Sequence, residues 1–533
     1  MDTIFYNGRI RTLDDNGSVA EAVGVENGKI IFVGSNEEAL AMECANRVDL
    51  GGRLMLPGFV DSHLHMLHYA FVEKSVKLFD CQSVEEILER VRERIDQRVE
   101  KPLTWLFCRG WNEELFDVAR YPHKDELDAI CNDIPIILVR VCGHMAVCNS
   151  MGLARLKEIK EFAEIEPYVD METGVLRENA VQFYYSVLEA PSQEEVEDYI
   201  LHGIEKMNAC GFTGIQSDDL ASLPGKQWRR IMNAYKALDE RDALNMRVYE
   251  QCLFERIDDA KSFIEEGFRT GQRGSHFTIG PMKLLQDGSL GAHTAALNEP
   301  YEGDEGNCGI SIYTQEELDD LLEFFDQHEM QAAVHCIGDR AMDMVIEAIA
   351  KSPYRKENPK NRHGIVHAQV TNPRILQAMK DHDVLTYIQP VFIDLDMDIV
   401  EPQIGKHRME KVYAWKSMLD MGIHASGGSD APVVSFDAME NIYFAVTMKD
   451  IHGRPEEGWI PSEKMSVDEA VKLFTKYAAY ASYTEDENGT IEIGKWADFV
   501  VLEKDIFEID PDDIKTTKID MTILEGKTVY KRS

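Results

Sequence analysis

The chain has 533 residues, too many for one ordinary domain, so we expect a large domain accompanied by a smaller one. A hydrophobic content of 44% is that of a globular protein and argues against disorder. The 56 basic and 95 acidic residues give a formal charge of −39, which argues against nucleic acid and anionic membrane as partners.

Both ends of the chain have the pattern of β-structure. Near the start, Ala22–Val25 and Lys29–Val33 flank Asn27-Gly28, which is a strong signal for a two-residue hairpin. Near the end lie three short apolar segments: Asp498–Leu502, Met521–Leu524 and Thr528–Tyr530. Neither end is long enough to bury a core alone, so we predict one small composite β-sandwich domain from residues 1–56 and 486–533. Two unrelated β-decorations are the alternative.

Between the two ends, short apolar strands alternate with amphipathic helices, a pattern typical of a parallel sheet. Capping boxes mark three helix starts, at Ser192 with Glu195, Thr314 with Glu317, and Ser466 with Glu469. We expect eight strands: Leu56–Val60, Gly214–Ser217, Arg247–Gln251, Met282–Leu285, Ala332–His335, Gly364–His367, Leu385–Gln389 and Ile423–Ser426. The fold class is therefore α/β, with a (β/α)₈ TIM barrel over residues 57–485. An open doubly wound sheet is the alternative, but it normally uses fewer parallel strands.

The connection between the first two expected strands, from Val60 to Gly214, is far longer than one helix requires. It contains an amphipathic helix at Ser83–Val99, with a capping box at Ser83 and Glu86, and strand-like segments at Leu103–Cys108 and Ile134–Val141. We predict an inserted α/β segment at about residues 80–190, positioned to cover the mouth of the barrel.

The first barrel strand ends in the sequence PGFVDSHLH. Since alternate residues of a strand face the same side, His63 and His65 point the same way. Two imidazoles at the C-terminal end of a barrel strand make a suitable pair of metal ligands. An isolated HxH is a weak signal, because most such pairs are structural.

Four later strand ends carry further ligand types. Lys283 lies near the end of the fourth strand, His335 and His367 end the fifth and sixth, and Asp430 follows the eighth. Each residue alone is more often a core histidine or a helix N-cap aspartate. Because all of them fall at the same end of successive strands, together they predict a metal site at the barrel mouth.

This ordered set of PGFVDSHLH, Lys, His, His and GSDAP resembles the amidohydrolase superfamily, and the resemblance extends over nearly the whole chain. The stretches KLLQDGSLGAHTA, AVHCIGDRA and IVHAQ are similar to its YtcJ-like branch, amidohydrolase family 3, which includes N-substituted formamide deformylase. A GHxxxxNS stretch of that branch is matched by Gly143-His144 and Asn149-Ser150. His293 departs from the branch, where Arg or Ser is more usual.

The resemblance implies a site for one or two divalent metals. His63, His65 and Asp430 would hold one metal and His335 and His367 the other, with Lys283 bridging them as a carbamate formed with CO₂. Such a lysine reacts as the neutral amine, which burial and nearby cations favour by lowering its pKa. The alternative is a protonated Lys283 paired with Asp287. Imidazole and carboxylate ligands suit Zn²⁺, with Mn²⁺, Fe²⁺, Co²⁺ and Ni²⁺ as alternatives.

The function that follows is hydrolysis of a C–N amide bond in an N-acyl or N-formyl amine. A metal-bridging hydroxide would attack the carbonyl, and Asp430 would act first as general base and then as general acid. A one-metal, deaminase-like aminohydrolase and a non-catalytic scaffold relative are the alternatives. The candidate substrate contacts are Trp111, His144, Asp287 and His293.

The expected location is the cytoplasm. The ten cysteines form no CxxC pair, the first ten residues lack the pattern of a signal peptide, and no apolar run reaches the roughly 18 residues of a membrane span. We expect a small-molecule substrate and neither nucleic acid nor membrane as a partner, and the oligomeric state is left open, with a homodimer among the options.

Overall fold

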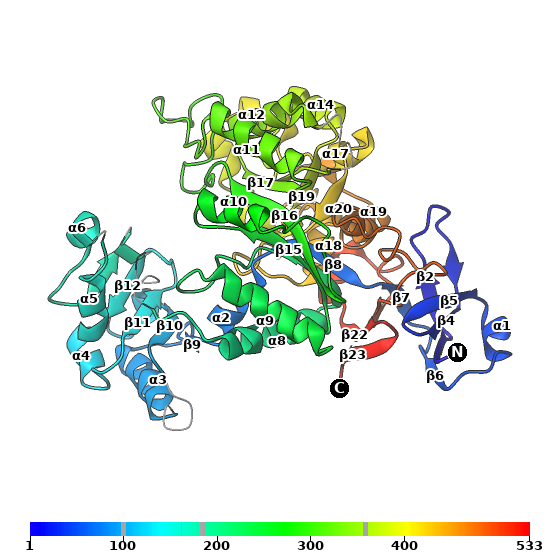
Figure 1. Cartoon of the computed structure of the whole chain (residues 1–533), viewed down its shortest axis with the longest axis horizontal. Helices are drawn as coiled ribbons and strands as arrows, with labels where there is room; N and C mark the ends of the chain where they lie inside the picture. Colours follow the sequence, from blue (N-terminus) through cyan, green and yellow to red (C-terminus); the bar gives the residue numbers. More distant parts are fainter. Residues whose placement is uncertain (98–102, 161, 179, 182, 184–187, 355–360) are drawn as a thin grey trace. The chain divides into compact units, whose positions relative to one another are not determined.

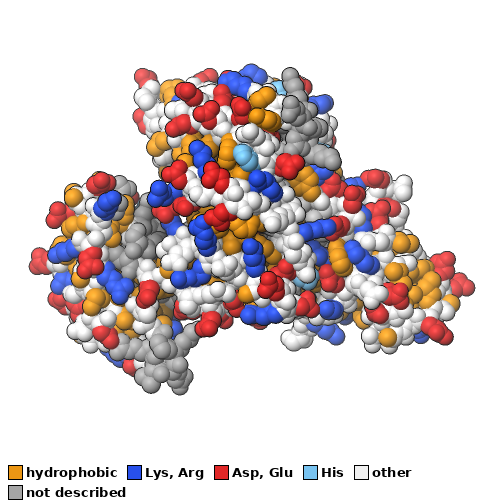
Figure 2. Space-filling view, viewed as in Figure 1, with side chains coloured by type: hydrophobic (Ala, Val, Ile, Leu, Met, Phe, Trp, Pro, Cys, Tyr) orange, Lys and Arg blue, Asp and Glu red, His pale blue; other side chains and the backbone are white. Residues whose placement is uncertain are grey.

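The computed structural model describes residues 1–97, 103–160, 162–178, 180–181, 183, 188–354 and 361–533 (Figure 1). The chain divides into two compact units. The first contains Met1–Met66, Leu201–Asp219 and Tyr235–Ser533, and the second contains Leu67–Ile200 and Leu220–Ala234. Acidic side chains are spread over the face drawn in Figure 2, with basic side chains interspersed among them.

The first unit contains the predicted eight-stranded parallel sheet, in the order in which the strands follow one another along the chain. All eight expected strands are present in it, which confirms the α/β class and a nearly closed barrel. The strands are β8 (Phe59–Leu64), β14 (Phe212–Ser217), β15 (Arg247–Leu253), β16 (Phe277–Leu285), β17 (Ala332–Cys336), β18 (Gly364–His367), β19 (Leu385–Ile388) and β20 (Ala425–Gly427).

The segment that follows β20 joins the last strand to the first. Asp430 N–H donates to the His63 carbonyl, and His65 N–H donates to the Ala431 carbonyl, each at 2.8 Å. Ser429 N–H donates to the buried carboxylate of Asp61 at 3.1 Å. A Cβ at Gly428 would lie 2.6 Å from the His63 nitrogen, so only glycine allows the two backbones to approach this closely.

One predicted strand proves to be two. The structure divides Leu56–Val60 at Gly58, where β7 (Leu54–Pro57) leaves the sheet of the terminal segments and β8 enters the barrel. Gly58 N–H donates to the Asp498 carbonyl at 2.9 Å, and Phe59 N–H donates to the Gly211 carbonyl at 3.1 Å. A side chain at position 58 would collide with Thr213, since a Cβ there would lie 2.2 Å from its hydroxyl oxygen.

Strands from both ends of the chain share one six-stranded sheet, in the order β23-β22-β21-β7-β2-β3, where the red C-terminal strands meet blue β7 (Figure 1). A four-stranded sheet has the order β5-β4-β1-β6. The predicted hairpin is confirmed, with Asn27 and Gly28 at the positive φ angles of 51° and 74° that such a turn requires. That the two sheets form a separate sandwich domain stays a prediction. Their strands are β1 (Thr3–Tyr6), β2 (Arg9–Arg11), β3 (Val19–Ala20), β4 (Ala22–Glu26), β5 (Lys29–Gly34), β6 (Asn46–Asp49), β21 (Phe499–Leu502), β22 (Ile519–Leu524) and β23 (Lys527–Lys531).

Helices connect the barrel strands. The capping boxes predicted at Thr314 and Ser466 are confirmed, and Ser192 and Glu195 exchange the same pair of hydrogen bonds. No helix in the described ranges is both long and apolar enough to cross a membrane. The main helices are α8 (Gln193–Ala209), α9 (Trp228–Glu240), α10 (Ile257–Glu265), α11 (Gln315–Gln327), α12 (Asp339–Lys351), α14 (Pro373–Asp381), α17 (Trp415–Met421), α18 (Ala438–Thr447), α19 (Val467–Leu473) and α20 (Lys476–Ala481).

The second unit has its own five-stranded sheet, in the order β13-β12-β11-β10-β9, and its own apolar core. The helix predicted at Ser83–Val99 is observed as α3 (Val84–Asp96), and residues 98–99 of that prediction lie outside the described residues. Ser83 caps α3, but the Glu86 carboxylate accepts from Gln82 N–H instead of completing a capping box. The strands are β9 (Val76–Lys77), β10 (Leu106–Trp111), β11 (Ile136–Arg140), β12 (Met145–Cys148) and β13 (Val175–Arg177).

Candidate metal centre

His63 lies at the end of β8, and one of its two ring nitrogens forms a hydrogen bond to a glutamine. Its Nδ1 donates to Gln251 Oε1 at 2.8 Å, and Gln251 Nε2 donates to the Ser62 carbonyl at 2.9 Å, which fixes the orientation of the amide. The opposite nitrogen, Nε2, therefore carries a lone pair and faces Asp430 Oδ1 at 3.3 Å. Both His63 and Gln251 are buried.

His367, at the end of β18, is oriented in the same way. Its Nδ1 donates to Gln389 Oε1 at 2.8 Å, and Gln389 Nε2 donates to the Tyr387 carbonyl at 2.9 Å. The φ angle of His367 is 79°, a left-handed conformation that is uncommon for a residue with a side chain and clusters at functional sites. Two histidines on different strands thus each keep one nitrogen unprotonated, because the other nitrogen donates to a glutamine.

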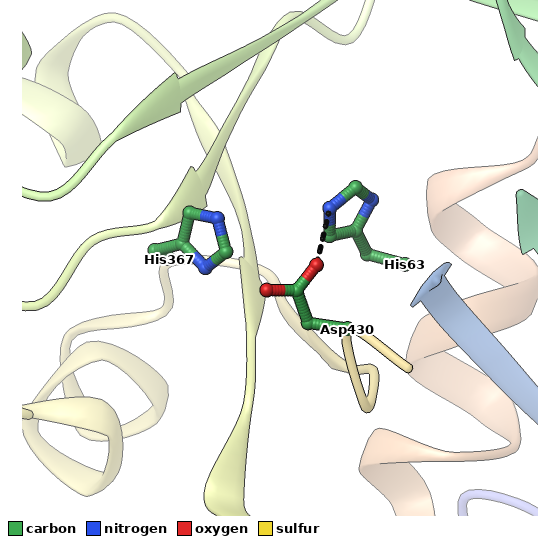
Figure 3. Close-up of side chains that lie close together, drawn as sticks. All are labelled: His63, His367 and Asp430. Carbon is green, nitrogen blue, oxygen red and sulfur yellow. Dashed lines mark ion pairs between the residues drawn. The ribbon is translucent and has the colours of Figure 1, made fainter. Parts of the chain in front are cut away.

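Asp430 completes this group. In Figure 3 its carboxylate points to the space between the imidazole rings of His63 and His367. Candidate ligand atoms of these three buried residues all lie within 4.8 Å of one another. Asp430 Oδ1 is also 2.9 Å from His65 Nε2. One imidazole from each of two strands and a carboxylate from the segment that follows a third are the donor types that Zn²⁺ and related ions prefer.

Sequence reasoning did not identify Asp218, which follows β14 directly. Its buried carboxylate is hydrogen bonded to His65 Nδ1, and His63, His65 and Asp218 form a second group whose ligand atoms lie within 4.8 Å. The available signal was an Asp-Asp pair at the end of the second barrel strand, the same position that defined the other candidates.

Lys283 lies on β16 and is 2% exposed. Its Nζ is 3.1 Å from His63 Nε2 and 3.3 Å from Asp218 Oδ2, so the ammonium pairs with Asp218. The alternative partner, Asp287, has its carboxylate bound instead by the backbone N–H groups of Ala296, Ile337 and Gly338 at 2.8–3.0 Å. Lys283 is thus placed beside the two groups of candidate ligands.

His335, on β17, lies beside His367 with ring centroids 4.5 Å apart. Its Nε2 is 3.1 Å from the Gly288 carbonyl and 3.4 Å from Asp287 Oδ1. His335 is therefore adjacent to the group of His63, His367 and Asp430 and is not one of its members.

Two histidines of the site have the neutral rings that metal binding requires. Burial and the Lys283 ammonium lower the pKa of His335 to about 4, and burial holds the pKa of His367 well below its usual value, so both rings are neutral near neutral pH. Burial also lowers the pKa of His65, but the carboxylates of Asp218 and Asp430 outweigh it and raise the pKa to about 10. His65 thus lies between two carboxylates, and their negative charge would also favour a metal cation at this position. These residues fit a divalent metal ion.

Three other residues were predicted to contact the substrate: Trp111, His144 and His293. Trp111 is fully buried in the core of the second unit, where its Nε1–H donates to the Leu138 carbonyl at 3.0 Å. His144 is exposed, with Nδ1 3.2 Å from a Glu178 carboxylate oxygen. His293 has a φ of 54° and stacks on Tyr301 with ring centroids 4.6 Å apart. Roles for these residues and for Asp287 in substrate binding stay predictions.

Imidazole and carboxylate groups gathered at the C-terminal ends of an eight-stranded parallel barrel are the arrangement of metal-dependent barrel hydrolases. Comparison with known families agrees. The model of the "Amidohydrolase family" matches residues 47–530, and the chain belongs to this family.

Three relatives cover nearly the whole chain. A protein of Bacillus subtilis (strain 168) named as an amidohydrolase, YtcJ, is 32% identical over 100% of both chains. N-substituted formamide deformylase of Arthrobacter pascens is 26% identical, over 100% of this chain and 99% of its own length. The crystal structure of an uncharacterized metal-dependent hydrolase from Pyrococcus furiosus is 25% identical, with a TM-score of 0.80 over 95% of this chain and 100% of its own. Family and relatives support an enzyme of the metal-dependent hydrolase type.

Proposed function

We propose that the chain hydrolyses a C–N amide bond of an N-acyl or N-formyl amine with the help of one or two divalent metal ions. One observation carries the proposal: Gln251 and Gln389 hold the outer nitrogens of His63 and His367, which directs both inner nitrogens toward Asp430. Hydrogen bonds of this kind behind a histidine are typical of metal ligands and maintain their orientation. The likeness to a relative named as a formamide deformylase supports the choice of bond.

His63, His65 and Asp430 would hold the first metal ion. Lys283, as a carbamate, would share it with a second ion held by His335 and His367, because the lysine nitrogen already lies 3.1 Å from His63 Nε2. A bound divalent ion would polarise the substrate carbonyl and make water a stronger nucleophile near neutral pH. Zn²⁺ suits the donor set best, with Mn²⁺, Fe²⁺, Co²⁺ and Ni²⁺ as alternatives.

The carboxylate of Asp430 would move the proton of the reaction. As the water oxygen bonds to the carbonyl carbon, an Asp430 oxygen accepts the proton that the water loses. The same oxygen then gives that proton to the amide nitrogen as the C–N bond breaks. The products are a carboxylic acid, or formate, and a free amine. Burial alone would raise the pKa of Asp430, but its contacts with His63 and His65 hold that pKa well below its usual value, so the group starts as a base.

A one-metal aminohydrolase is the second candidate. It is favoured by the pairing of Lys283 with Asp218 at 3.3 Å, because a lysine that stays protonated cannot bridge two ions. The compact group of His63, His367 and Asp430 would then serve a single ion. Such an enzyme would act on an amidine or a ring carbon and release ammonia.

Metal content and product chemistry together test the proposal. We expect protein prepared with Zn²⁺ or Mn²⁺ to bind between one and two ions per chain, and to release formate or another carboxylate from a panel of N-formyl and N-acyl amines. Protein stripped of metal should not. Ammonia release from amidines with about one ion per chain would favour the second candidate. An ordered protein that binds no divalent ion would refute both.

A further inference from the structure

A cavity lies at the opposite end of the barrel from the candidate metal centre. It has a volume of about 460 Å³, within the range of small-molecule sites. The cavity is lined by the N-terminal halves of β8 and β15, by Thr213–Gln216 of β14, by the segment that leads into β16, and by three connections of the C-terminal quarter of the chain. All of these residues belong to the first unit.

Two buried polar atoms of this lining lack a hydrogen-bond partner among the described residues. The first is Oε1 of Gln216, a fully buried residue of β14. Its amide orientation is fixed, because Nε2 donates to the Ala478 carbonyl at 2.9 Å and the oxygen must therefore point elsewhere. The second is Nδ1 of His276, which is 7% exposed and whose Nε2–H donates to Glu525 at 3.1 Å. On a neutral ring this Nδ1 is an acceptor, so both atoms require a donor.

The charged groups of the lining are mostly paired with each other. Arg247 contacts Asp498 at 2.7 Å and Glu525 at 2.9 Å, and Arg273 contacts Glu487 at 2.7 Å. Asp242, which is exposed at the edge of the cavity, adds a fourth carboxylate. Four carboxylates face two guanidinium groups and the ammonium of Lys29, which lies 3.3 Å from the centroid of the Trp496 ring, so these groups sum to 3 − 4 = −1. The cavity therefore offers acceptors and a negative field.

Buried polar atoms are nearly always hydrogen bonded in folded proteins, and an unsatisfied one costs roughly 1–3 kcal/mol. Water can fill such a place if it finds two or more partners. A ligand that carries N–H donors and a positive charge would satisfy the two acceptors and also the excess of carboxylates. A neutral polyol would satisfy only the acceptors, and an anion would meet repulsion from the carboxylates.

We propose that this end of the barrel is a second small-molecule site, for an organic cation with several N–H donors. The site is independent of the chemistry at the metal centre, because it uses none of the candidate metal ligands.

Calorimetric titration of the full-length, metal-loaded protein tests this with 1,4-diaminobutane as the probe and 1,4-butanediol as its uncharged match. We expect saturable binding of one diamine per chain and much weaker binding of the diol. Gln216→Met, which removes the buried acceptor, should weaken binding at least ~10-fold. Asp242→Asn, at an exposed position where folding is not at risk, should weaken it about threefold. Glu410→Gln, an exposed carboxylate away from the cavity, is the control and should change nothing.

An amine is also a product of the proposed reaction, so binding at the metal centre must be separated from binding here. Asp430→Asn should leave the affinity for the diamine unchanged if the proposed site is correct. Affinity that is lost in Asp430→Asn and kept in Gln216→Met and Asp242→Asn would place the amine in the metal centre and overturn the proposal. No saturable binding of the diamine would also overturn it, leaving water as the occupant.

Discussion

Polar side chains at the two ends of the barrel have different kinds of partner. At the C-terminal ends of the strands, Nδ1 of His63 and Nδ1 of His367 each form a hydrogen bond to a glutamine. The Nε2 atoms of both rings face a space that they share with Asp430. At the N-terminal ends, Arg247 and Arg273 are paired directly with carboxylates. The first arrangement directs lone pairs into a space that the side chains share, whereas the second satisfies most charges within the protein.

We infer that the polar groups at the C-terminal end serve a reaction and that the ion pairs at the N-terminal end stabilise the fold. Convergent groups that perturb one another's pKa are typical of active sites. Paired charges between strands and a terminal segment mainly hold the two together. Mutations at the C-terminal end should therefore change metal binding and turnover, while mutations at the N-terminal end should change the free energy of unfolding.

The largest effect is expected for Asp430→Asn. Asparagine keeps an oxygen near His63 and His65 but cannot carry a proton between water and amide nitrogen, so kcat should fall at least ~100-fold. Steady-state kinetics and metal analysis of the same preparation measure this. Asp304→Asn, in an exposed turn, is the matched control. Near-normal turnover of Asp430→Asn would show that another group moves the proton.

Lys283→Ala should lose the second metal ion before the first. If Lys283 bridges as a carbamate, the variant should fall from about two ions per chain to about one, and added acetate should partly restore the second. Reconstitution of the wild-type protein should also be slower without bicarbonate. Lys406→Ala, an exposed lysine, is the control. Full metal content in Lys283→Ala would remove the bridge and favour the one-metal candidate.

Gln251→Leu and Gln389→Leu test whether the glutamines orient the histidines for a metal. Each variant removes the acceptor of an Nδ1–H, so we expect metal affinity to fall roughly 10–100-fold while the fold is kept. Competition with a chelator measures the affinity, and circular dichroism checks the fold. Gln377→Leu, on the exposed face of α14, should bind metal normally. If the buried variants do so as well, the two glutamines are structural only.

Glu525→Gln should have its effect at the other end, on stability and not on turnover. The hydrogen bond from His276, with the charge of Arg247, lowers the pKa of Glu525 to about 2 although burial opposes this. Because the folded-state pKa lies below that of the unfolded chain, the stabilisation is present above pH 4.5 and is lost as the pH falls toward 2. We expect Glu525→Gln to lose roughly 1–3 kcal/mol of unfolding free energy at pH 7.

Urea unfolding at pH 7 and again near pH 3 measures this difference, which should shrink at the lower pH. Glu503→Gln, whose carboxylate forms an exposed pair with Arg532 at 3.0 Å, should change stability by at most about 0.5 kcal/mol. A difference between Glu525→Gln and wild type that is independent of pH would contradict the assignment.

Much of the fold was predictable because it depends on local patterns. Apolar strands, capping boxes such as that of Thr314, and the Asn27-Gly28 turn are encoded within a few residues, and the structure confirms them. The division of the first strand at Gly58 was not predictable, since it depends on contact with Thr213, more than a hundred residues away.

The candidate site was predictable in part for the same reason. His63, His367 and Asp430 follow from their positions at strand ends. Gln251 and Gln389 have no motif, because their role depends on an amide that reaches a histidine on another part of the sheet. Asp218 occupies a strand end as the others do, but a carboxylate at a strand end is also a common helix cap, so position alone did not distinguish it.

The closure of the barrel by Asp430 has a consequence for synthesis of the protein. Asp430 and His65 are 365 positions apart in the sequence, and the backbone bonds between their segments join the last strand of the barrel to the first. A nascent chain that has not yet released β20 from the ribosome has its paired histidines but lacks the carboxylate between them. Newly made chains should therefore acquire their metal only after the whole barrel has been translated, and a chain truncated before Asp430 should be unable to retain it.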